Sequence, residues 1–184
     1  MLSNQTRVGL ALFTAMSLTA LAAEGAAPGY VDFGKLIPPS AGGEFVEVQI
    51  KSNLINIAAR LAEKTEPEVA DVLRGLQAIR VNVVGLNESN RAATQERVKA
   101  IRDQLESQGW ERIVTAQSGK EDVGVYLKTR GDEAVQGVVV TVLEGDKEAV
   151  LVNIVGDLKP EKLAMLGEKF NIEPLKKIPV PVKK

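Results

Sequence analysis

The chain of 184 residues contains no cysteine and no histidine, and the two absences exclude many kinds of site. Without cysteine there is no disulfide, no zinc-thiolate site, no thiol nucleophile and no cysteine for a lipid anchor. Without histidine, Ser-His-Asp and Cys-His mechanisms and the histidine-bearing zinc hydrolase motifs are excluded too. Oxygen ligands alone favour calcium, magnesium or manganese, so we expect no activity that depends on bound zinc or copper. We also expect no cofactor.

Aromatic residues make up only 4% of the chain, so the core has to be built from Val, Leu, Ile and Ala. A scarcity of Tyr and Trp also weakens any interpretation as a sugar-binding or base-stacking protein. The 23 basic and 24 acidic residues are spread along the chain. Nucleic-acid binders usually carry a basic stripe, so we expect no nucleic-acid partner.

Enzyme motifs are missing as well. Gly119-Lys120 has Val114 where a phosphate loop needs its first glycine and Glu121 where it needs Ser or Thr. No dinucleotide-binding glycine run follows a strand, and no serine has a lysine three residues on. The carboxylate pairs, such as Glu121 with Asp122, fall on expected turns and caps, where solvated side chains are the rule. The sequence therefore predicts a protein that is not an enzyme.

The first residues are typical of an export signal. One cation, Arg7, precedes an apolar run from Val8 to Leu21 that ends in the small-x-small pattern Ala20-Leu21-Ala22. Residues 1–22 are therefore predicted to be a signal peptide, cleaved near Ala22, and the mature chain to be periplasmic or secreted. No second apolar run is long enough to cross a bilayer, so we expect no transmembrane segment in the mature chain.

The rest of the chain divides into three parts. Residues 23–43 are rich in Gly, Pro and Ala and are predicted to be an extended lead-in, with the folded unit starting near Glu44. Residues 44–170 are predicted to be a single α+β domain, and 171–184 a basic, proline-containing tail.

Within the domain, apolar periodicity predicts the order β-αα-β-α-ββββ-α. The strands are expected in 45–50, 79–86, 113–114, 123–127, 135–143 and 150–155, and the helices in 54–62, from Pro67, in 90–108 and from Pro160. Thr65 to Glu68 match a capping box for the second helix. The fold class is therefore α+β, a two-layer sandwich with a largely antiparallel sheet and helices packed on one face.

Three segments together resemble the bacterial domain-of-unknown-function 4252 family. They are LRGLQAIRVNVVGL, the GW followed by a hairpin ending in VGVYLK, and VLVNIVGDLKPEKLAML. The resemblance covers about residues 44 to 167. It implies an exported envelope protein, often from Gram-negative bacteria, and it carries over neither an activity nor catalytic residues. Many members look like lipoproteins, whereas this chain lacks the cysteine for that anchor.

Two segments are candidate binding sites. Arg130, Gly131 and Asp132 form a tripeptide known from cell adhesion, although such short matches are common by chance and a glycine turn between two strands is the preferred explanation. The tail carries its charge on Lys176, Lys177, Lys183 and Lys184 and is expected to project from the domain. The simpler interpretation is a solvated or loosely packed terminus without a function. In the functional interpretation, these lysines are attracted to an anionic surface or an acidic protein.

By elimination, the sequence favours a non-enzymatic envelope domain that binds a partner, such as another envelope protein, through its sheet face or an edge strand. A carrier of a small apolar ligand and an enzyme using only carboxylates and lysines, such as a hydrolase, stay open as alternatives. A deep groove with facing carboxylates would favour the enzyme, a dry apolar cavity the carrier and a filled core the interaction domain. Neither the partner nor the oligomeric state follows from the sequence.

Overall fold

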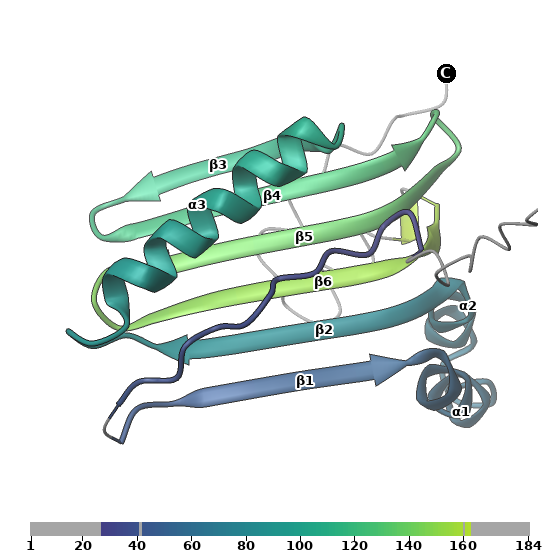
Figure 1. Cartoon of the computed structure of the whole chain (residues 1–184). Coiled ribbons are helices and arrows are strands. Elements are labelled where there is room, and N and C mark those ends of the chain that lie inside the picture. The colour runs from purple at the N-terminus through teal and green to yellow at the C-terminus, as the bar shows by residue number, and fades with distance from the viewer. Residues whose placement is uncertain (1–26, 41, 160, 163–184) are drawn as a thin grey trace, which may run out of the picture.

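The computed structural model describes residues 27–40, 42–159 and 161–162, and Figure 1 shows their arrangement. The sheet has six antiparallel strands in the order β1-β2-β6-β5-β4-β3. The strands are β1 (Phe45–Lys51), β2 (Leu76–Gly85), β3 (Glu111–Ser118), β4 (Glu121–Arg130), β5 (Ala134–Glu144) and β6 (Glu148–Leu158). The helices in the described ranges are α1 (Ser52–Ala62), α2 (Pro67–Gly75) and α3 (Arg91–Ser107). The predicted α+β class with an antiparallel sheet is confirmed, as is the predicted order of elements through β6.

One face of the sheet lies beneath α3 and an extended segment, residues 27–40, which we call the strap (Figure 1). Because side chains alternate along a strand, this strap face takes every second residue of each strand. Trp110 is 5% exposed and belongs to the buried hydrophobic cluster on this side. The cluster also contains Val31, Phe33 and Leu36 of the strap, Val98, Ile101 and Leu105 of α3, and Tyr126, Val139 and Leu151 of the sheet.

The strap corrects the predicted start of the folded unit. Its backbone is extended, as Gly and Pro suggested, but Phe33 is completely buried and Val31 and Leu36 are nearly so. The fold therefore includes residues 27–40 and does not start near Glu44. The apolar residues of the strap are too few and too unevenly spaced for the sequence to indicate this packing.

The opposite face of the sheet, which we call the valine face, is apolar across all six strands. Residues of this face stand directly opposite one another on neighbouring strands, so that they form rows from one edge of the sheet to the other. Its middle row consists of Val48, Val81, Val152, Val140, Val125 and Val114. Figure 1 shows α1 and α2 beside one end of the sheet, where β1 ends and β2 begins. Their residues Ile55 and Val72 join the buried cluster of the valine face.

Helix α2 begins where the sequence predicts, but its N-terminus is not capped in the predicted way. Pro67 is the first helical residue, where its fixed φ fits and its missing N–H costs nothing. The residue before it, Glu66, takes the cap position, and no side-chain capping bond forms, so the predicted capping box is wrong. Leu76 continues the apolar helical spacing of Val69, Val72 and Leu73 in the sequence, but in the structure it begins β2 opposite Gly156.

Candidate interaction surface

Exposed apolar side chains gather at one edge of the molecule. In the described part of the chain, seven large hydrophobic residues are exposed, and six of them belong to β1 or α1. They are Phe45, Val46 and Val48 of β1, and Leu54, Ile57 and Leu61 of α1. Single exposed hydrophobic residues are ordinary, but a contiguous group on adjacent elements is typical of a binding site. We call these six residues the α1/β1 surface.

Helix α1 is apolar on two sides. Ile55 and Ala59, four residues apart, are each 2% exposed and face the core. Leu54, Ile57 and Leu61 follow the same helical spacing on another side and are 53%, 54% and 76% exposed. A large aliphatic side chain that stays exposed lacks the stabilisation of about 1.5–3 kcal/mol that burial would give. The outer stripe therefore does not serve the packing of this domain.

Strand β1 is an open edge of the sheet. It pairs with β2 without a bulge from Phe45↔Val84 to Lys51↔Ala78, and no described strand lies on its other side (Figure 1). The Gly85 N–H donates to the Glu44 carbonyl at 2.7 Å. Hydrogen-bonded positions alternate in an antiparallel pair, so Phe45, Glu47 and Gln49 direct their N–H and C=O groups away from β2.

The other edge of the sheet is built differently. Strand β3 carries a register irregularity between Arg112 and Val114. Its exposed residues are polar or charged, Thr115 at its centre among them. Bulges and charged side chains are devices by which proteins protect sheet edges against further pairing. Strand β1 lacks the bulge and has apolar side chains, so of the two edges β1 is the one suited to accept another strand.

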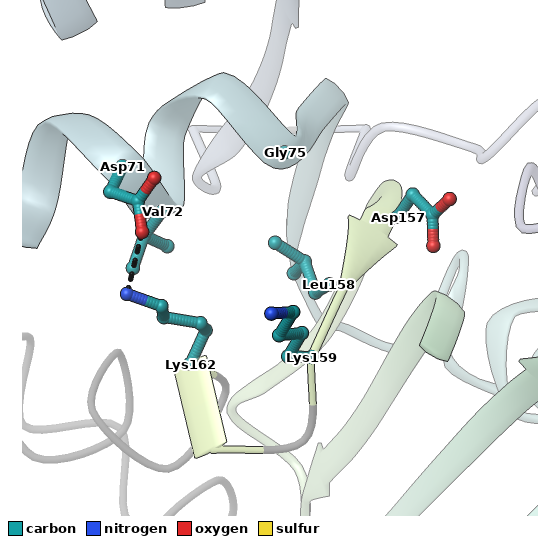
Figure 2. Close-up of a pocket in the computed structure, with 7 residues that line it drawn as sticks. All are labelled: Asp71, Val72, Gly75, Asp157, Leu158, Lys159 and Lys162. Carbon is teal, nitrogen blue, oxygen red and sulfur yellow. Dashed lines mark ion pairs between the residues drawn. The ribbon is translucent and has the colours of Figure 1, made fainter. Parts of the chain in front are cut away.

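A pocket of about 210 Å³ lies between α2 and the end of β6 (Figure 2). The carboxylate of Asp71 points to Lys162 and pairs with it at 2.7 Å, while Asp157 points away from the pocket. The hydrogen bond and charge of Lys162 lower the pKa of Asp71. An acid/base pair needs two carboxyl groups that converge on a substrate. These two carboxylates diverge, so the pocket has the form of a surface ion-pair site.

The second pocket, of about 350 Å³, is lined by the hairpin turns at 118–121 and 144–147. Four of its charged side chains pair with one another: Lys147 with Glu144, and Lys120 with Asp146 at 3.5 Å. The hydrogen bond to Glu144 raises the pKa of Lys147. Neither pocket described here is the dry apolar cavity that a lipid-type carrier needs.

The tripeptide Arg130-Gly131-Asp132 lies at the β4–β5 turn. Gly131 has a φ of 55°, which favours glycine, as the turn interpretation required. Arg130 forms an ion pair of 2.9 Å with Asp157 on β6, so its guanidinium is already engaged within the domain. The four tail lysines lie outside the described residues, and their role stays a prediction.

The α1/β1 surface was not identified from the sequence. In the sequence, Leu54, Ile57 and Leu61 share an apolar helical spacing with Ile55, which predicts one buried face for all four. The available signal was the width of that face, because apolar residues at positions 54, 55, 57, 58, 61 and 62 cover more of the helix than one buried stripe occupies.

Two further observations concern metal-binding groups and membrane-spanning helices. Within residues 27–40, 42–159 and 161–162, no three acidic side chains lie close enough together to hold a metal ion. In the same ranges, no helix combines the length and the apolar character needed to cross a bilayer.

The structure describes a small sheet domain with exposed apolar residues at one edge, and comparison with known proteins places it in a family. A model of the family "Domain of unknown function (DUF4252)" matches residues 42–166. The chain belongs to this family, as its sequence pattern suggested.

Other comparisons add little. No curated protein is similar enough to count as a relative. The solved structure of the protein of unknown function PA94 from Pseudomonas aeruginosa is 10% identical, with 78% of this chain and 90% of that one covered. Its TM-score of 0.38 is too low to support an argument.

Proposed function

We propose that this protein is a non-enzymatic interaction domain of the bacterial envelope that binds a protein partner through its α1/β1 surface. The observation that carries the proposal is the concentration of exposed apolar residues on one open edge strand and the helix that follows it. An added strand would gain main-chain hydrogen bonds from β1, while the outer stripe of α1 would supply apolar contacts for specificity.

The envelope location rests on the signal-like residues 1–22 and on the family resemblance. Export would bring the mature domain to a compartment where it meets other exported proteins. The open main-chain groups of β1 support a protein partner over a lipid one, because a membrane surface offers no N–H and C=O ladder to satisfy Phe45, Glu47 and Gln49.

Site-specific photo-cross-linking tests the proposal. A photoreactive residue is introduced at Ile57 or Leu61, and a matched control at Gln104, an exposed residue of α3. In the intact envelope, we expect discrete protein adducts from positions 57 and 61 and none from 104. Equal adducts from all three positions, no adduct from any of them, or labelling of phospholipid alone would contradict a protein-binding role for this surface.

A further inference from the structure

The edge of β1 is self-complementary. We propose that the partner on the α1/β1 surface is a second copy of this chain, joined by antiparallel pairing of two β1 strands about Val48. This inference rests on the proposed function and names its partner. The resulting two-fold dimer would continue the sheet from six strands in one copy into six strands in the other.

The two-fold axis limits the possible registers. An axis normal to the sheet keeps each side chain on its own face, so residues of equal parity must stand opposite each other. Pairing about Glu47 would set two glutamates against each other, which is unfavourable. Of the remaining registers, only pairing about Val48, the midpoint of β1, uses the whole strand, and it sets Val48 against Val48.

The same register satisfies the free main-chain groups. It makes Glu47↔Gln49 and Phe45↔Lys51 the hydrogen-bonded pairs, and these are the positions whose N–H and C=O groups point away from β2. No two like charges stand opposite each other. Val46↔Ile50 and Val48↔Val48 become the closely spaced pairs on the valine face, so the apolar rows run on into the second copy.

The pairing also brings α1 to the interface. Phe45 of one copy stands opposite Lys51 of the other, and α1 begins at the next residue, Ser52. The exposed start of β1 in one copy therefore lies near the start of α1 in the other. One two-fold contact accounts for exposed apolar residues on both elements, whereas a peptide added to β1 alone would leave the outer stripe of α1 in water.

The absence of native cysteine makes a direct test possible. Cα atoms of a closely spaced antiparallel pair lie about 4.5 Å apart, within reach of a disulfide. We expect Val48→Cys to form a disulfide dimer rapidly under mild oxidation. The matched control, Thr115→Cys at the centre of the opposite edge, should react slowly.

Charge substitutions test the same axis by sedimentation velocity. Val48→Lys should raise the dimer dissociation constant by about tenfold or more, because it sets two lysines against each other on an edge. Thr115→Lys should leave the constant unchanged. Mixing Val48→Lys with Val48→Asp should restore a dimer, which misfolding of either variant would prevent.

The outcomes separate the two claims. Monomeric wild-type protein, or Val48→Cys that reacts no faster than Thr115→Cys, overturns the dimer. If Leu61 then still cross-links to a different protein, the proposed function stands with another partner. If Leu61 gives no adduct either, both claims are wrong.

Discussion

The Val31 N–H of the strap donates a 2.9 Å hydrogen bond to Asn153 Oδ1 in the middle of the sheet. The amide nitrogen of Asn153 in turn donates to the Gly29 carbonyl at 3.0 Å and to the Val138 carbonyl at 3.2 Å. Asn153 is completely buried. One side chain therefore attaches the strap to the sheet through two hydrogen bonds, while its third bond goes to the neighbouring strand β5.

Replacing this side chain should loosen the strap. Asn153→Ala leaves the Val31 N–H and the Gly29 carbonyl buried without their partner, and an unsatisfied buried group costs about 1–3 kcal/mol. We expect a loss of about 2–4 kcal/mol in the free energy of unfolding, measured by urea denaturation. Gln104→Ala on the exposed side of α3 is the control. A loss below about 0.5 kcal/mol, the range of ordinary surface substitutions, would show that the strap does not depend on Asn153.

The strap also depends on two facing glycines. A Cβ built at Gly137 would lie 2.6 Å from the Gly29 Cα and 2.6 Å from Trp110 Cη2. Gly137→Ala should therefore displace the strap or the indole and cost about 3 kcal/mol, the upper end of the range for overpacking. In Gly119→Ala the new Cβ meets no neighbour within 4 Å, so only the positive φ should cost free energy, about 1 kcal/mol. Equal losses in the two variants, by urea denaturation, would argue against the close contact.

The buried phenol of Tyr126 leads us to expect that the free energy of unfolding depends on pH in the alkaline range. Burial raises the pKa of its phenol above 10.0, and the charges of Arg112 and Arg102 offset this only in part. A raised native pKa means that the unfolded chain loses this proton first. The stability contribution is thus complete below pH 10 and falls as pH rises through the native pKa.

Substitution isolates that contribution. Among the described residues the Tyr126 hydroxyl has no hydrogen-bond partner, so Tyr126→Phe should change stability by less than about 0.5 kcal/mol at neutral pH. Urea denaturation between pH 9 and 11.5 should show a steeper loss for the wild type than for Tyr126→Phe. Parallel curves would mean that this phenol titrates equally in both states.

Export predicts the residue at which the mature chain begins. Cleavage after Ala22 would give a protein that starts at Ala23, four residues before the first described residue of the strap. Intact-mass spectrometry of the protein from an envelope fraction measures this directly. A full-length mass that retains Met1 and Leu2 would contradict both the cleavage and the envelope location.

Sequence periodicity was sufficient to predict the strands of the sheet, but not the segments that pack against them. In β2, Ile79, Val81 and Val83 alternate with Arg80 and Asn82, which correctly indicates a strand with one apolar face. The same alternation suggests that Arg80 and Asn82 face solvent. Instead, they are 8% and 4% exposed, because they lie on the strap face.

Arg80 shows why the strap escaped prediction. Its guanidinium donates to the Val31 carbonyl at 2.9 Å and to the Tyr30 hydroxyl at 3.0 Å, and it lies over the Phe33 ring. These contacts join residues about 50 positions apart, and no local pattern encodes them. The outer stripe of α1 was missed for the opposite reason, since the periodicity was seen but does not tell which side of an apolar helix is buried.

The central claim is that Ile57 and Leu61 serve binding and not folding. The most direct test places a photoreactive residue at Phe45 on β1 and measures its cross-linking yield with and without Ile57→Ser/Leu61→Ser on α1. Both side chains are more than half exposed, so the free energy of unfolding should change by no more than about 0.5 kcal/mol per site. If α1 and β1 form one binding surface, the yield from Phe45 should fall about tenfold or more, as expected for the loss of apolar anchors. An unchanged yield, or a large loss of stability in the double variant, would contradict the account.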